Sequence, residues 1–261
     1  MNRLQKLRQH LAVQGLDALL VSQSQNRRYL SGFTGSTGWL LISATVSAIA
    51  VDFRYVEQVG TESPNFEVLH IKGDLPHWLP SLVADFGIKK LGFEANHITV
   101  ATYQQLCNAM SQGQHQLQLI PTAGIVESLR TTKEPAEIKS IIEAAALADA
   151  AVNYARTIVQ PGMSEREIAW ELEEFVREKG SEAIPFDFIV ASGPNSAMPH
   201  ARPTKRIVAK GEPILLDIGA RVEGYCSDLS RTLCIGDEDK TFSKIYNIVL
   251  GAQLTALATI T

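Results

Sequence analysis

The segment Pro213–Ile235 constrains the fold of this chain most, because it places two aspartates inside a predicted β-hairpin. Two runs rich in apolar and small residues, Pro213–Ala220 and Tyr225–Ile235, are predicted strands. Between them, Glu223-Gly224 suits a tight two-residue turn. The segment therefore predicts two antiparallel strands whose register is set by the turn.

That register decides whether the two aspartates meet. If Val222 pairs with Tyr225 across the turn, Asp217 lies opposite Ser230, two positions from Asp228. The aspartates are then diagonal neighbours on one face, with Cα atoms roughly 7–8 Å apart. A different turn length would change this prediction.

Two carboxylates so close within an apolar sheet repel each other and lose hydration. A divalent cation, or two cations bridged by carboxylates and water, would relieve the repulsion and supply an activated hydroxide. Oxygen ligands combined with imidazole favour Mn, Zn, Co or Fe over a thiolate site. The alternative is that one aspartate is a solvated strand residue and the other caps a turn; the spacing leaves both interpretations open.

Composition excludes several classes of protein. The 261 residues are 45% hydrophobic and 20% charged, which excludes disordered and low-complexity chains. A net charge of −4 gives no general attraction to nucleic acid or anionic membranes, so neither is expected as a partner. Three cysteines without a C-x-x-C spacing indicate reduced thiols, and no signal peptide is recognised at the start; the expected location is the cytoplasm.

Two domains are expected, 1–125 and 126–261. In the first, short apolar runs alternate with amphipathic stretches, which predicts an α/β domain with a mixed sheet. The uncharged stretch Tyr29–Val51 is too rich in Ser, Thr and Gly for a membrane span and is interpreted as an exposed hairpin and loop. The predicted strands of this domain are Asp17–Ser22, Trp39–Ser43, Ala48–Asp52, Glu67–Ile71, Lys90–Glu94 and Gln116–Pro121, with helices around 53–60, 76–86 and 99–112.

The second domain is predicted to begin with a long helix. Pro135 suits its first turn, and apolar residues recur at helical spacing from Ala136 to Val159. A capping box, Ser164 with Glu167, then starts a second helix that stops at Gly180. A strand, Phe186–Ala191, and a proline-flanked loop containing His200 precede the hairpin.

The hairpin sequence LLDIGARVEGYCSDLSRT, preceded by FIVASGPNSAMPHARP, resembles the catalytic domain of the creatinase and proline-peptidase family, which has the pita-bread fold. LRTTKEPAEI is similar to the start of that domain, and NRRYLSGFTGS and VDFRY resemble the creatinase-type N-terminal domain. The resemblance covers essentially the whole chain. It implies an α/β (α+β) protein with a creatinase-type N-terminal α/β domain and a partial pita-bread catalytic domain.

The resemblance also implies site residues. Asp217 and Asp228 match the first two carboxylate ligands of a two-metal centre, with Asp228 bridging both ions. His200 matches the histidine that holds the substrate or polarises the scissile carbonyl; without the motif it would be an ordinary loop histidine. The implied activity is that of a metal-dependent Xaa-Pro aminopeptidase or dipeptidase. Its cofactors would be two divalent metal ions, with Mn favoured, its substrate a peptide with proline in second position, and its assembly a homodimer.

The other histidines and the glycine-rich segment give no evidence of a functional site. The histidines at 10, 70, 77, 97 and 115 have no acidic partner at metal spacing and are expected at the surface or in packing. The segment GFTGSTG at 32–38 lacks the lysine of a phosphate loop and is expected to be a tight connection.

The chain departs from the family pattern after the hairpin. The family site needs one further histidine and two further glutamates, which are not found before Thr261, and the helical pattern Phe242–Thr261 ends without a stop signal. The chain is therefore expected to be C-terminally incomplete, to bind metal weakly and to have little activity alone. The alternatives are a non-catalytic binding or interaction protein and, less favoured because both aspartates are kept, a metal-free amidinohydrolase of the creatine type.

Overall fold

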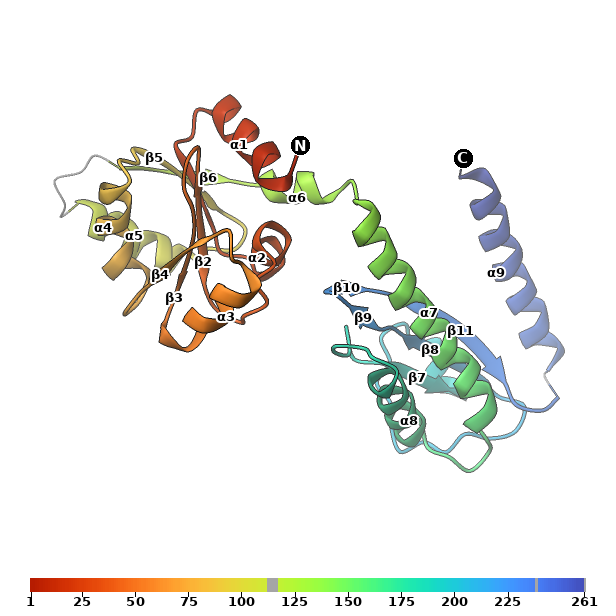
Figure 1. Cartoon of the computed structure of the whole chain (residues 1–261). Coiled ribbons are helices and arrows are strands. Elements are labelled where there is room, and N and C mark those ends of the chain that lie inside the picture. The colour runs from red at the N-terminus through yellow and green to blue at the C-terminus, as the bar shows by residue number, and fades with distance from the viewer. Residues whose placement is uncertain (112–116, 238, 261) are drawn as a thin grey trace. The chain divides into compact units, whose positions relative to one another are not determined.

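The computed structural model describes residues 1–111, 117–237 and 239–260 and divides into two compact units, Met1–Thr132 and Lys133–Thr261 (Figure 1). The division comes several residues after the expected 125/126 boundary. Helix α6 (Ile125–Arg130) explains the difference, because Ile125 and Val126 are buried in the core of the first unit. None of the helices in the described residues is long and apolar enough to cross a membrane.

The first unit is built on a six-stranded mixed sheet in the order β4-β3-β2-β1-β5-β6. Strand β2 is antiparallel to both neighbours, and the other adjacent pairs are parallel. The predicted strands are confirmed to within two residues where the structure describes them; Gln116 lies outside the described residues. The strands are β1 (Ala18–Val21), β2 (Trp39–Ser43), β3 (Ser47–Val51), β4 (Glu67–His70), β5 (Lys90–Glu94) and β6 (Gln118–Thr122).

Helices cover both faces of this sheet because each presents an apolar stripe to it. One core is formed with α1, α2, α3 and α6, and the other with α4 and α5. The helix predictions around 53–60, 76–86 and 99–112 are confirmed over their described residues. The bounds are α1 (Arg3–Gln14), α2 (Ser24–Ser31), the short 3₁₀ helix η1 (Phe53–Tyr55), α3 (Val56–Glu62), α4 (Leu75–Asp85) and α5 (Val100–Ser111).

The interpretation of Tyr29–Val51 as an exposed hairpin and loop is confirmed for the hairpin and wrong for its exposure. Strands β2 and β3 form an antiparallel hairpin within the sheet and are almost entirely buried. The preceding helix α2 was not predicted, because the side chains that it buries include polar ones, with Asn26 and Arg27 only 0% and 3% exposed. The buried carboxylate of Glu94 holds the start of this helix, accepting from the backbone N–H of Gln23 at 2.7 Å and from Asn26 Nδ2 at 2.6 Å.

The second unit packs two helices on a three-stranded antiparallel sheet in the order β11-β8-β7. Its first helix begins at Pro135 as predicted, and the capping box at its second helix is present. The bounds are α7 (Pro135–Ile158), α8 (Glu165–Glu178), β7 (Ile189–Ser192), the short 3₁₀ helix η2 (Gly193–Ala197), β8 (Pro213–Ile218), β9 (Arg221–Val222), β10 (Tyr225–Cys226) and β11 (Leu229–Cys234).

Only part of the apolar spacing along α7 lies in the core. Ile138 and Ile142 are 47% and 61% exposed, whereas the small residues Ala144, Ala148 and Ala151 are buried. Alanine lets the helix approach its neighbours closely, and hairpin strand β10 contacts α7.

The last helix, α9 (Lys240–Thr259), confirms the helical prediction there. None of its described residues is buried, and apolar side chains such as Ile245, Ile248 and Val249 are 56%, 62% and 63% exposed.

Candidate metal centre

The hairpin has the predicted register. Val222 pairs with Tyr225 at the turn, and Ser230 pairs with Asp217 along β8 and β11. Both turn residues have positive φ, 48° at Glu223 and 81° at Gly224, as a two-residue turn of this type requires. Asp217 therefore lies opposite Ser230, whose hydroxyl donates to Asp217 Oδ1 at 2.8 Å.

The alternating burial of β8 places Asp217 on the face away from the helices. Ile214, Leu216 and Ile218 are fully buried in the core with α7 and α8. Leu215 and Asp217 alternate with them and are only half-buried. The aspartate is thus at the rim of an apolar core, where a carboxylate is partly stripped of water.

Asp228 does not lie within a regular strand, contrary to the prediction of one strand from Tyr225 to Ile235. Strands β10 and β11 are separated by Ser227 and Asp228. The Ser227 hydroxyl donates to the Ala144 carbonyl of α7 at 2.7 Å and accepts from the Ala220 N–H at 3.0 Å. A side-chain link to the helix thus replaces part of the strand ladder just before Asp228.

Gly219 lets the chain pass closely at this break. A Cβ atom on Gly219 would lie 2.2 Å from the Ser227 carbonyl oxygen, which is a backbone atom and cannot move aside easily. Glycine is therefore required opposite Asp228 for steric reasons.

The two carboxyl groups interact. Desolvation raises the pKa of Asp228, and the charge of Asp217 and a hydrogen bond between the two carboxyl groups raise it further. The charge of Asp217 thus makes ionisation of Asp228 less favourable, as expected for two neighbouring carboxyl groups.

Two carboxylates that repel each other are a donor set suited to a hard or borderline divalent cation. Among residues 1–111, 117–237 and 239–260, no group of three or more His, Cys, Asp and Glu side chains is placed to hold a metal ion. His200 therefore does not join Asp217 and Asp228 in a three-residue set. A cation bound here would keep most of its water.

His200 is exposed in the segment that follows β7. A turn holds it, with the Ala201 N–H donating to the Met198 carbonyl at 3.2 Å, and Ala201 is 6% exposed. The segment begins beside β8, where Ser192 pairs with Ile214. Sequence reasoning identified His200 but missed Glu165, which anchors this segment; its only signal was an acidic residue in the first turn of a capped helix.

The remaining histidines were expected at the surface or in packing. His10, His70, His77 and His97 are exposed, which confirms their interpretation as surface residues, but His77 contacts the carboxylate of Asp74, an acidic partner that was not expected. His115 lies outside the described residues.

The glycine-rich segment 32–38 is a tight connection, as predicted. The buried guanidinium of Arg27 donates to the carbonyls of Gly35 at 2.8 Å and Gly38 at 2.9 Å. Burial lowers the pKa of Arg27, although the charge of Glu94 opposes the shift. These carbonyls accept from a cation in the interior, and the segment is stabilised by a side chain of its own unit.

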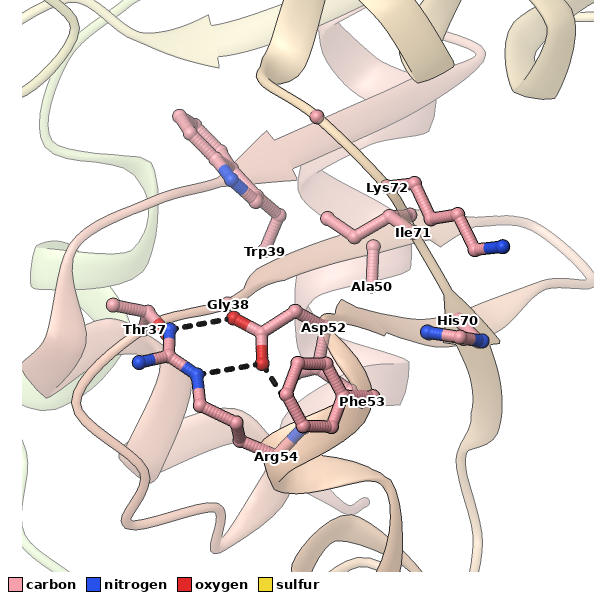
Figure 2. Close-up of a pocket in the computed structure, with 12 residues that line it drawn as sticks. Thr37, Gly38, Trp39, Ala50, Asp52, Phe53, Arg54, His70, Ile71 and Lys72 are labelled. Atoms are coloured by element: carbon pink, nitrogen blue, oxygen red, sulfur yellow. Dashed lines mark hydrogen bonds and ion pairs between the residues drawn. The ribbon is translucent and has the colours of Figure 1, made fainter.

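The first unit also has a hollow of about 890 Å³ beside the ends of β3 and β4, lined by Trp39, Asp52, Arg54, His70 and Lys72 among others (Figure 2). The Asp52 carboxylate accepts from Arg54 Nε at 2.9 Å and Nη2 at 2.8 Å, and this hydrogen bonding lowers the pKa of Asp52 to about 2. The ion pair in this hollow is thus satisfied internally, unlike the aspartate pair of the hairpin.

Family models match both units and place the chain in the class of two-domain metallopeptidases. Residues 3–132 match the creatinase/prolidase N-terminal domain, and residues 139–261 match metallopeptidase family M24. The chain is 39% identical to an uncharacterized peptidase, YqhT, of Bacillus subtilis, over 98% of this chain and 71% of that protein. The chain belongs to metallopeptidase family M24.

Solved structures agree with this membership. The Xaa-Pro dipeptidase from Bacillus anthracis has a TM-score of 0.90 at 39% identity, covering 97% of this chain and 70% of that one. The X-Pro aminopeptidase from Thermotoga maritima has a TM-score of 0.88 at 32% identity, covering 98% of this chain and 72% of that one. These similarities confirm the expected creatinase-type and pita-bread domains.

Proposed function

We propose that this chain contributes Asp217, Asp228 and His200 to a site for metal-dependent hydrolysis of the peptide bond before proline. The observation that carries the proposal is the pair of interacting carboxyl groups, Asp217 and Asp228, on one hairpin of a family M24 chain. Similarity to an Xaa-Pro dipeptidase and an X-Pro aminopeptidase supports proline in the second position of the substrate.

In this proposal Asp217 and Asp228 would hold the two divalent cations, with Mn favoured. Bound cations supply Lewis acidity and neutralise the repulsion between the carboxylates. The Ser230 hydroxyl orients Asp217 through its hydrogen bond, and Ser227 fixes the backbone that presents Asp228. His200 holds the substrate carbonyl by donating a hydrogen bond, which stabilises negative charge on that oxygen as the bond is attacked.

Three further expectations belong to the same proposal. The three cysteines, Cys107, Cys226 and Cys234, form no disulfide bond among the described residues, which supports a reducing compartment such as the cytoplasm. A homodimer and the preference for Mn follow from the family resemblance.

The proposal is tested by cleavage of Gly-Pro and Gly-Ala peptides with limiting Mn²⁺. Two forms are compared: the 261-residue chain, and a chimera that continues into the C-terminal part of the Bacillus subtilis relative. We expect little activity from the 261 residues, Mn-dependent cleavage before proline by the chimera, and loss of that cleavage in Asp228→Asn.

Undiminished turnover by the Asp228→Asn chimera would contradict the metal role of this residue. A fast reaction of the 261-residue chain would contradict the expected need for further ligands. If the chimera binds no Mn²⁺ and cleaves nothing, the non-catalytic alternative is favoured.

A further inference from the structure

A fully buried glutamate holds both ends of the segment that carries His200. Glu165, the first residue of α8, has no exposed surface. Its Oε1 accepts from the backbone N–H and the hydroxyl of Ser192 at 2.7 and 2.8 Å. Its Oε2 accepts from the backbone N–H and the hydroxyl of Thr204 at 3.0 and 2.6 Å. The two oxygens of this carboxylate therefore bind opposite ends of the segment 192–204, Oε1 at Ser192 and Oε2 at Thr204.

A third residue connects the two ends. Asn195 Nδ2 lies 3.0 Å from Oε1 and 3.1 Å from Oε2 of Glu165. Arg206 supports the arrangement from outside, donating to the Ser192 hydroxyl at 2.7 Å and pairing with Glu212. The donors at this carboxylate thus come from the start, the interior and the end of one segment.

The charge of Glu165 is compensated by these donors. Burial raises its pKa, but hydrogen bonds from Thr204 and Ser192 outweigh that effect, so that the pKa lies below its ordinary value. A buried carboxylate with this many donors is stable as the anion. A glutamine could accept at one end only, because its amide nitrogen is a donor.

The enclosed segment presents an exposed imidazole on a restrained backbone. Between its two ends lie the short helix η2 and the turn from Met198 to Ala201, whose buried alanine is a further fixed point. His200 has no burial of its own to orient it. The restraints on its backbone are the neighbouring buried Ala201 and the closure of the segment at Glu165.

We propose that Glu165 is a positioning residue, which holds His200 in one place by binding both ends of the segment 192–204. The inference rests on the proposed role of His200 toward the substrate. A hydrogen-bond donor that acts on a reacting carbonyl must be held in place beforehand, since misplacement by about 1 Å can cost on the order of 100-fold in rate.

The test compares Glu165→Gln with Glu167→Gln in the metal-free chain. Glu167 is the matched control, since it lies in the same turn of α8 but accepts from Ser164 at 2.7 and 2.8 Å. Two readouts are used: amide hydrogen exchange of peptides within 193–203, and the ring signals of His200 in ¹⁵N-histidine NMR spectra, assigned with His200→Gln.

We expect Glu165→Gln to speed exchange within 193–203 by about tenfold or more and to shift the His200 signals, with exchange in α8 and β8 changing much less. Glu167→Gln should leave the segment and the His200 signals as they are. Unchanged His200 signals in Glu165→Gln, or equal acceleration throughout the second unit, would overturn the proposal.

A second variant keeps the test decisive if Glu165→Gln does not fold. Thr204→Val removes one hydroxyl donor and keeps the backbone N–H and the carboxylate. We expect the same local change at 193–203 and His200 on a smaller scale, and its absence would overturn the proposal. Neither readout needs metal or substrate, so an inactive protein with the expected His200 changes would refute the proposed function alone.

Discussion

At the scale of single residues, Asp217 and Asp228 form a pair that is unfavourable without a counter-ion. The raised pKa of Asp228 reflects lost hydration and the neighbouring charge of Asp217. A fold that keeps such a pair loses some stability unless a cation binds there. The same residues should thus have opposite effects on stability in the presence and absence of metal.

Asp228→Asn should stabilise the metal-free chain because it removes one of two repelling charges. We expect the melting temperature in EDTA at pH 7 to rise by about 1–3 °C, and the stabilisation by added Mn²⁺ to disappear. Differential scanning fluorimetry measures both, with Asp149→Asn on the exposed surface of α7 as the control. A lower melting temperature in EDTA would show that the two charges are not in conflict.

The pH dependence of stability should reveal how much the charge of Glu165 contributes to it. Its pKa is lowered from 4.5 in the folded chain, so its charged form stabilises the fold above about pH 4.5, and this contribution is lost as the pH falls through the lowered pKa. Hydrogen exchange within residues 193–203, followed from pH 7 to pH 3, should show a difference in local stability between wild type and Glu165→Gln that narrows in acid. A difference independent of pH would exclude the charge as its cause.

At the scale of elements, the hairpin shows which structural features the sequence can predict and which it cannot. The turn residues Glu223-Gly224 were enough to predict the register, because a two-residue turn permits only one pairing. The break before Asp228 could not be predicted, since it depends on a hydrogen bond from Ser227 to Ala144, far away in the sequence. The hydrogen bonds from Ser192 and Thr204 to Glu165 could not be predicted for the same reason.

Helix α2 could not be predicted from apolar periodicity. Apolar periodicity finds helices that bury apolar faces, but α2 buries Asn26 and Arg27, which are satisfied by Glu94 and by the carbonyls of the segment 32–38. Those partners lie elsewhere in the chain.

Gly219→Ala should disrupt the hairpin where it carries Asp228. The added methyl group would meet the Ser227 carbonyl oxygen at 2.2 Å, and we expect a loss of about 1–3 kcal/mol in unfolding free energy, together with weaker Mn²⁺ binding. Gly251→Ala in α9 is the control, because a Cβ atom at that residue would have no neighbour within 4 Å among the described residues. Equal stability of the two variants in urea unfolding would contradict the close approach.

At the scale of the whole molecule, the chain consists of two units with separate cores. The cores that include α1 and α4 belong to the first unit, and the core of α7, α8 and β8 belongs to the second. The sequence predicted two domains because short apolar runs give way to a long helical pattern after about residue 126. It could not place the boundary, since only the packing of α6 decides to which core this helix belongs.

Substitutions in one unit should therefore leave the other unaffected. Arg27→Lys loses the planar set of donors that binds Gly35 and Gly38, and we expect it to lower protection from hydrogen exchange by about tenfold or more within residues 18–51. Protection in β8 and β11 should remain unchanged. Loss of protection in both units would show that they unfold together.

The most direct test of the central claim is Mn²⁺ binding to the 261-residue chain, measured by isothermal titration calorimetry and by electron paramagnetic resonance of free Mn²⁺. If Asp217 and Asp228 hold the cation together, wild type binds weakly, with a Kd of about 10⁻⁴–10⁻³ M, as for sites with few charged ligands. Asp217→Asn and Asp228→Asn should each weaken binding by about tenfold or more, and Asp149→Asn should have no effect. Equal Mn²⁺ affinity in wild type and both hairpin variants would contradict the account.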